Sequence, residues 1–186
     1  MARDPAEERR GMKSLLPFLL ITFLFFSFAA GGKTEEADTI SVWIFTAIDC
    51  PIANGYAPEL TRIQHDYESR GVEFLIVYPE PTLSKSEIEA HLAEYQLQFS
   101  YQHDSNHTLV SHSGATVTPE VVVFAPKDHL VYRGKIDNRY SEYGDRRNSA
   151  TETYLRDVLD RLLSGSTVEF HETEAIGCFI EALAEN

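Results

Sequence analysis

Cysteine is scarce in this 186-residue chain, which contains only Cys50 and Cys178. A C-x-x-C motif starting at Cys50 is excluded, because the position of its second sulfur holds Ala53. Any redox chemistry must therefore be carried by Cys50 alone, by Cys50 with a partner molecule, or by the two distant cysteines together.

Positive charge is also scarce, with 16 Lys and Arg against 29 Asp and Glu and a formal net charge of −13. Such an acidic surface argues against nucleic acid or anionic lipid as a partner, because both are bound chiefly through Lys and Arg. Simple solubility accounts for most of this charge. The sequence also lacks internal repeats and low-complexity segments, and its length suits one domain with extensions.

The first thirty residues carry the pattern of an export signal. Basic residues up to Lys13 precede an apolar run from Leu15 to Ala30, which ends in small residues. This order predicts a secretory signal peptide over residues 1–30. A cleaved signal is favoured over an N-terminal membrane anchor, because the run is shorter than the ~20 residues of a spanning helix. We therefore expect an exported protein, periplasmic or extracellular, with membrane attachment through this segment as the alternative.

The rest of the chain alternates between strand and helix patterns. Strands are predicted at residues 40–45, 72–78, 99–103, 121–124 and 130–133, and helices at residues 53–70, 84–95, 107–112 and 151–163. Pro58 lies in the first of these helices and predicts an irregular or kinked beginning. Alternation followed by a hairpin predicts an α/β fold with a mixed sheet covered on both faces.

Cys50 lies between the first predicted strand and the first predicted helix. A cysteine at a helix N-terminus lies at the positive end of the helix dipole, beside unpaired N–H groups, and both favour its thiolate form. Pro51 supports this placement, because proline is favoured at the first helical position. The alternative is a buried small hydrophobe, for which a strand-to-helix loop is a poor location. We therefore predict that Cys50 is a reactive nucleophile.

Three segments together resemble the thioredoxin-like superfamily, specifically the secreted bacterial redoxins related to thiol-disulfide oxidoreductases and peroxiredoxins. They are DCPIANGYAPEL at residues 49–60, GATVTPE at 114–120 and YRGKID at 132–137. The resemblance implies a thioredoxin-like fold, a mixed central sheet with helices on both faces, over residues 38–165.

The same resemblance implies roles for two residues. It places Cys50 on the family's nucleophilic cysteine and Pro119 on its cis-proline, which lies beside the active sulfur and helps to present the substrate. The expected activity is thiol-disulfide exchange, and the expected partners are protein or small-molecule thiols and disulfides. No cofactor and no metal ion is implied.

The chain departs from the family in two ways. Ala53 cannot resolve a mixed disulfide as the second cysteine of a dithiol redoxin would. A peroxiredoxin would carry Pro seven residues and Thr or Ser three residues before its cysteine, where this chain has Trp43 and Ala47. This weakens the interpretation as a thiol peroxidase, which stays open as an alternative because Thr46 is adjacent.

Cys178 lies in a C-terminal tail predicted at residues 166–186. One hypothesis is that the tail folds back, so that Cys178 serves as the resolving or structural partner of Cys50. Export and the even number of cysteines motivate it, and the long intervening loop is no obstacle, because closure entropy grows slowly with length. The alternative is an unrelated tail thiol that awaits another partner.

A non-catalytic binding module is the second functional interpretation. His103 and His107 are spaced as on one helical face, with His112, Asp104 and Cys50 as further candidate ligands for copper or zinc. Simple solvation of these histidines in a polar loop is favoured over metal binding. The charged loop over residues 137–147 is interpreted as a solvated insertion, with a docking surface as the alternative.

Overall fold

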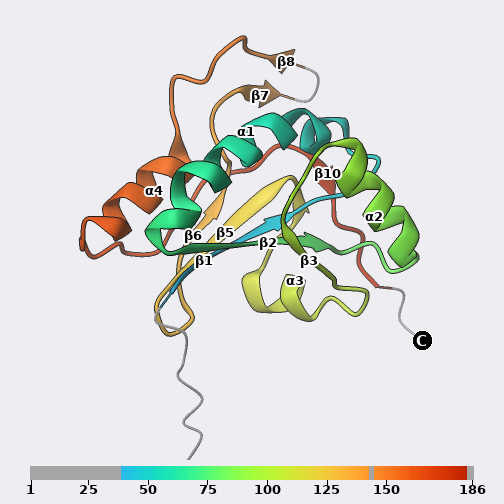
Figure 1. Ribbon diagram of the computed structural model, residues 1–186, viewed down its shortest axis with the longest axis horizontal. Coiled ribbons are helices and arrows are strands. Elements are labelled where there is room, and N and C mark those ends of the chain that lie inside the picture. Colours follow the sequence, from blue (N-terminus) through green and yellow to red (C-terminus); the bar gives the residue numbers. More distant parts are fainter. Residues whose placement is uncertain (1–38, 143–144, 184–186) are drawn as a thin grey trace, which may run out of the picture. The chain divides into compact units, whose positions relative to one another are not determined.

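The computed structural model describes residues 39–142 and 145–183 (Figure 1). The signal or anchor predicted over residues 1–30 lies outside these residues. Within the described part of the chain, the helices are all too short or too polar to cross a membrane.

A six-stranded mixed sheet forms the centre of the fold, with the strand order β3-β2-β1-β5-β6-β9 (Figure 1). The strands are β1 (Ile40–Phe45), β2 (Val72–Tyr78), β3 (Ser100–His103), β5 (Glu120–Ala125), β6 (His129–Gly134) and β9 (His171–Glu172). Strand β1 pairs parallel with β2 and antiparallel with β5, and β5 continues into the antiparallel hairpin with β6. The mixed sheet predicted from the sequence is confirmed.

Helices cover both faces of this sheet, as predicted. They are α1 (Pro51–Tyr67), α2 (Lys85–Glu94), α3 (Thr108–Ser113) and α4 (Tyr154–Leu163), with a 3-10 turn, η1 (Glu68–Arg70), after α1. Helices α1, α2 and α4 lie on one face and α3 on the other (Figure 1).

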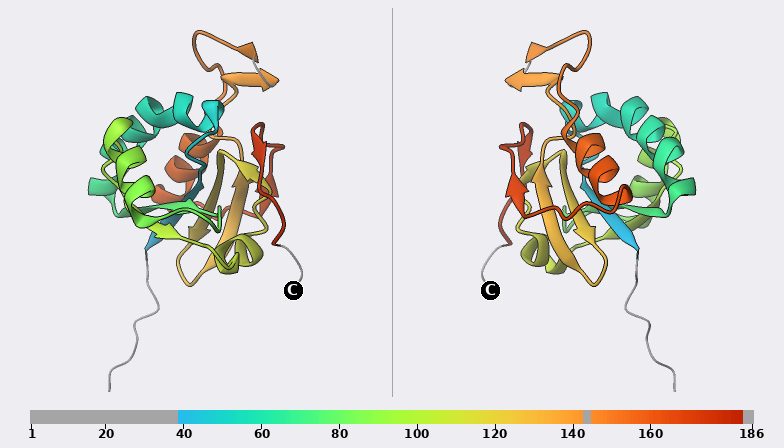
Figure 2. Two further views of the ribbon diagram at one scale, coloured as in Figure 1. Left: turned by 90° about the vertical axis from the view of Figure 1, so that its right-hand side faces the viewer. Right: turned by 90° about the vertical axis from the view of Figure 1, so that its left-hand side faces the viewer.

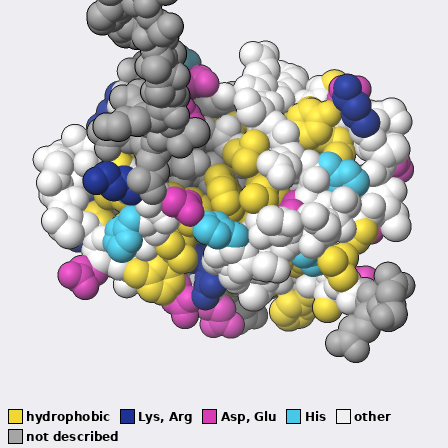
Figure 3. Space-filling model, turned by 90° about the horizontal axis from the view of Figure 1, so that it is seen from below, with side chains coloured by type: hydrophobic (Ala, Val, Ile, Leu, Met, Phe, Trp, Pro, Cys, Tyr) yellow, Lys and Arg dark blue, Asp and Glu magenta, His cyan; other side chains and the backbone are white. Residues whose placement is uncertain are grey.

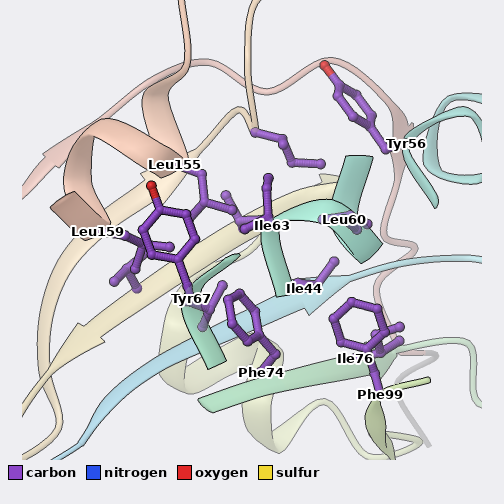
Figure 4. Packing of buried hydrophobic residues seen from close by; sticks show 14 of the residues in the cluster. Ile44, Tyr56, Leu60, Ile63, Tyr67, Phe74, Ile76, Phe99, Leu155 and Leu159 are labelled. Carbon is purple, nitrogen blue, oxygen red and sulfur yellow. The ribbon is translucent and has the colours of Figure 1, made fainter. Parts of the chain in front are cut away.

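The alternation of side chains along the strands produces two apolar cores, one on each face. In β5, Val121 and Val123 join the larger core, whereas Val122 and Phe124 join the smaller core under α3. Figure 4 shows the larger core, where aromatic and aliphatic side chains of α1, α4 and the strands interdigitate.

Helix α1 begins at Pro51, two residues earlier than predicted, and therefore directly after Cys50. Proline is tolerated there because the first N–H groups of a helix have no helical partner. The helix continues through Pro58 to Tyr67, and its buried face includes Leu60 and Ile63 (Figure 4).

Five short strands were not predicted, because two or three residues carry too little periodicity. Strand β4 (Val117–Thr118) pairs with β10 (Cys178–Phe179), and β7 (Tyr140–Glu142) pairs with β8 (Asp145–Arg146). Strands β9 and β10 both fall within the tail predicted at residues 166–186, and β9 pairs parallel with β6 at the edge of the central sheet.

The interpretation of residues 137–147 as a solvated insertion is wrong for its first part. Asp137 and Arg139 are buried and form an ion pair of 3.2 Å with each other. The Tyr56 hydroxyl donates to Asp137 at 2.7 Å, which ties the loop to α1. A charge that is satisfied in this way is compatible with burial.

Candidate active site

Cys50 is the N-cap residue of α1, which confirms the prediction that it lies at a helix N-terminus. Its backbone is extended, and its carbonyl accepts the first helical hydrogen bond, from the Asn54 N–H at 3.0 Å. The side chain is fully buried, and its thiol donates to the Thr118 carbonyl at 3.0 Å. Cys50 is therefore in contact with a segment 68 positions later in the sequence.

Thr118 and Pro119 are joined by a cis peptide bond. The buried Glu120 carboxylate accepts hydrogen bonds from the Thr116 and Val117 N–H groups, at 2.7 and 3.5 Å, and so holds the segment before the proline. Burial raises the pKa of Glu120, and these backbone donors partly oppose that shift. Pro119 thus lies next to the residue that contacts Cys50, where the resemblance places the family's cis-proline.

The C-terminal tail places Cys178 beside Cys50 and Thr118. Strand β10 pairs antiparallel with β4, with Cys178 opposite Thr118. The Ile180 N–H donates to the Thr116 carbonyl at 2.9 Å, and the Cys178 thiol donates to the Cys50 sulfur across 3.0 Å. Both cysteines are free, so the structure holds two thiols in contact and not a structural disulfide.

Gly177 permits this close approach of the tail to β4. A Cβ atom built at this position would overlap the Thr118 carbonyl, which is backbone and has little freedom to move. Any other residue at position 177 would therefore displace the adjoining Cys178 from its place opposite Thr118.

The environment of Cys178 keeps its sulfur protonated. The pKa of Cys178 is raised to about 11, chiefly by burial, with contributions from the hydrogen bond to Cys50, the Cys50 charge and the Asp49 carboxylate. At neutral pH Cys178 is therefore a thiol that can donate its hydrogen to the Cys50 sulfur.

Alkylation of Cys178 in the reduced protein is expected to follow this shift. Its rate should rise with a midpoint near pH 11, against the ordinary value of 9.0, so that about 100-fold less thiolate reacts at pH 8. Mass spectrometry of iodoacetamide-treated protein across pH measures the rate at each cysteine. Because the pKa of Cys178 is higher in the folded protein than in the unfolded chain, its protonated form contributes to the free energy of unfolding. This contribution is fully present below pH 9 and is lost as the pH rises toward 11.

The variant Cys50→Ala is the control for this experiment. It leaves most of the burial around Cys178 but removes the hydrogen bond and the charge of Cys50, so the midpoint should fall toward 9. A midpoint near 9 in the unmodified protein would contradict the environment described for Cys178.

A cavity of about 670 Å³ is lined by Cys178 and by Asp49 and Pro51, the neighbours of Cys50 in the chain. Its walls come from the loop after β1, from residues 79–83 after β2, and from the tail between Cys178 and Glu181. Three carboxylates line it, those of Asp49, Glu80 and Glu181, and none of the described lining residues is Lys or Arg. Phe179 stands at its rim with 84% of its surface exposed.

The candidate metal ligands are not brought together. His103 and His107 each bond through Nε2 to a backbone carbonyl, at 2.8 and 2.9 Å, and His112 pairs with an aspartate at 3.0 Å. Asp104 accepts two N–H bonds from the start of α3. Figure 3 shows histidines spread over the α3 face. Among the residues that the structure describes, no three His, Cys, Asp or Glu side chains form a metal-binding group.

Sequence reasoning missed a hydrogen-bond chain that supports the Cys50 loop. The Asn54 amide donates to the Ile48 carbonyl at 3.0 Å, which leaves its oxygen to accept from His91 Nε2 at 2.9 Å. His91 Nδ1 then accepts from the Tyr78 hydroxyl at 2.8 Å. Burial lowers the pKa of His91, which favours the neutral ring that this arrangement requires. The helical position of His91 was visible in the sequence, but its partners were not.

Comparisons with known proteins yield structural neighbours only. No protein-family model matches the chain, and no curated protein matches it significantly. The hypothetical protein SMc02350 from Sinorhizobium meliloti 1021 is similar with a TM-score of 0.69 at 22% identity, over 81% of this chain and 83% of that one. An uncharacterized conserved protein from Geobacillus kaustophilus has a TM-score of 0.67 at 26% identity, over 82% of both chains.

One of the structural neighbours is described as a thioredoxin. A putative thioredoxin from Neisseria meningitidis is similar with a TM-score of 0.52 at 14% identity, over 71% of this chain and 77% of that one. The fold is thioredoxin-like. The thioredoxin-like fold implied by the sequence resemblance is therefore confirmed.

The thioredoxin-like fold explains why Cys50 and Pro119 meet. Strands β1 and β5 are antiparallel neighbours, with Phe45 at the end of β1 opposite Glu120 at the start of β5. The loop that leaves β1 and the turn that enters β5 therefore lie together at one end of these two central strands. The tail brings Cys178 to the same end.

Proposed function

We propose that this protein is an exported thiol-disulfide oxidoreductase in which Cys50 is the attacking thiolate and Cys178 the resolving thiol. The observation that carries the proposal is the 3.0 Å approach of the two sulfurs beside Pro119. A resolving thiol must reach the sulfur of the mixed disulfide, and Cys178 already lies at that distance.

The reaction has two exchange steps. The Cys50 thiolate attacks one sulfur of a substrate disulfide, which breaks the substrate S–S bond and expels the other sulfur as a thiolate that takes a proton from water. Cys178 then attacks the Cys50 sulfur, its proton passes to the second substrate thiolate, and the Cys50–Cys178 disulfide forms. Two protein thiols are oxidised and one substrate disulfide is reduced to two thiols. The reverse sequence oxidises substrate thiols.

The surroundings of the two sulfurs support further parts of the proposal. Pro119 is the residue proposed to help present the substrate, because it follows Thr118, which contacts both cysteines. The adjoining cavity offers room for the substrate disulfide. Export rests on the signal pattern in residues 1–30, which would deliver the dithiol to an oxidising compartment.

The proposal is tested by thiol mapping together with turnover. After mild oxidation, a non-reducing digest should contain a linked pair of peptides carrying Cys50 and Cys178. The reduced protein should accelerate insulin-disulfide reduction by dithiothreitol, whereas a variant with both cysteines replaced by serine should not. Equal insulin rates for the two proteins would overturn the proposal in favour of a non-catalytic docking module. Peroxide-dependent sulfenic acid at Cys50 without insulin turnover would overturn it in favour of a peroxidase.

A further inference from the structure

The cysteine proposed as the nucleophile is the one that a substrate cannot reach in this structure. Cys50, at the helix N-terminus, has no exposed surface. Cys178 is partly exposed and borders the cavity, but its environment holds it as a thiol. In this arrangement an external disulfide can reach only the Cys178 sulfur, so exchange at Cys50 requires a change in what covers Cys50.

The tail provides part of that cover. Strand β10 lies along β4, and the Cys178 sulfur contacts the Cys50 sulfur directly. The tail is drawn in red in Figure 2. Its strand β10 belongs to a separate two-stranded sheet with β4, so β10 can separate from β4 without breaking the strand pairs of the central sheet.

The attachment of β10 is slight. It is two residues long and pairs with the two residues of β4. Beyond this pairing, the Ile180 N–H donates to the Thr116 carbonyl at 2.9 Å, and the Thr118 hydroxyl donates to the Cys178 carbonyl at 3.4 Å. The Phe179 side chain adds little packing, because it is mostly exposed, and Cys178 and Ile180 are only partly buried against the larger and the smaller core. Segments with few buried contacts and short ladders open at low free-energy cost.

The tail is held more firmly just before β10. The Thr173 N–H donates to the Arg133 carbonyl at 3.0 Å, and the Thr173 hydroxyl lies 2.7 Å from that of Tyr132 and accepts from the Lys135 N–H at 2.9 Å. Strand β9 also pairs with β6 directly before Thr173. Thr173 is therefore an anchor, and the chain beyond it can leave β4 and return.

We propose that residues 177–180 form a gate over Cys50, which an external disulfide or thiol can reach only while this segment is separated from β4. Closure of the gate returns the Cys178 sulfur to the Cys50 sulfur, so the same movement completes the second exchange step. The use of the gate in turnover rests on the proposed function, whereas access to Cys50 is measurable without turnover.

The gate is tested by alkylation of Cys50 in the reduced, full-length Cys178→Ser protein, where no second thiol competes. Adding Gly177→Ala places a Cβ against the Thr118 carbonyl and should hold the gate open. Because an open state is commonly populated at about 0.1–10%, Cys50 should then react with iodoacetamide about 10-fold faster or more. Ala175→Val is the matched control, a larger change in the same tail but outside the pairing with β4, and should leave the rate unchanged.

Hydrogen exchange in the Cys178→Ser protein supplies a second measurement that does not depend on Gly177→Ala folding correctly. The Ile180 amide, which bonds to the Thr116 carbonyl, should open with the same equilibrium constant as Cys50 alkylation reports, and far more often than the amides of β1. Equal alkylation rates with and without Gly177→Ala, or an Ile180 amide as protected as β1, would overturn the gate. If the unmodified protein reduces insulin and either of these results is found, the gate proposal is wrong and the oxidoreductase proposal is unaffected.

Discussion

Replacing Cys50 with serine is expected to lower the insulin-reduction rate by about 10³-fold or more, because a hydroxyl at this site cannot replace the thiolate nucleophile.

Replacing Cys178 with serine should instead block the second exchange step. The first exchange still occurs, but the intramolecular thiol that releases the substrate is absent, so the mixed disulfide between Cys50 and the substrate accumulates. Acid quenching followed by intact-mass analysis detects this species.

The double serine variant is the control, since it should neither turn over nor retain substrate. Full activity in Cys50→Ser would show that Cys50 is not the nucleophile. A Cys178→Ser protein that turns over at the unmodified rate without trapped substrate would assign resolution to an external thiol and remove Cys178 from the cycle.

Oxidation of the pair is expected to stabilise the fold strongly. A Cys50–Cys178 bond would join residues 128 positions apart, and the chain-entropy model assigns a loop of this length about 5 kcal/mol of unfolding free energy. With a typical urea dependence, the midpoint of unfolding should rise by about 2 M on oxidation. Urea titration of the oxidised and reduced protein, followed by circular dichroism, measures the difference.

Cys178→Ser is the control for the stability experiment, because its midpoint should be the same with and without reductant. Unchanged midpoints for the unmodified protein, with the linked peptide pair present, would mean that the bond strains the fold by as much as it restricts the unfolded chain.

The sequence predicted the central strands well, because they are long apolar runs that only a buried sheet accommodates. The bounds of β1 and β2 agree with the prediction residue for residue. The position of Cys50 at the start of α1 was also predictable, because Pro51 is a helix-start signal.

The partner of Cys50 was not predictable from local pattern. The position of Cys178 depends on β4 and β10, each two residues long, and on the absence of a side chain at Gly177. The buried start of the 137–147 loop escaped prediction for a related reason. Asp137 is buried because Tyr56 and Arg139 satisfy it, and neither partner is marked in the sequence.

The place of Cys178 in the chain has a consequence for biogenesis. Synthesis proceeds from the N-terminus, so every strand of the central sheet precedes Cys178 in order of appearance. A nascent chain therefore displays Cys50 before the segment that shields it exists. During that interval the Cys50 sulfur lacks its Cys178 partner and is open to exchange with any disulfide that it meets, until Cys178 has been synthesised and β10 has paired with β4.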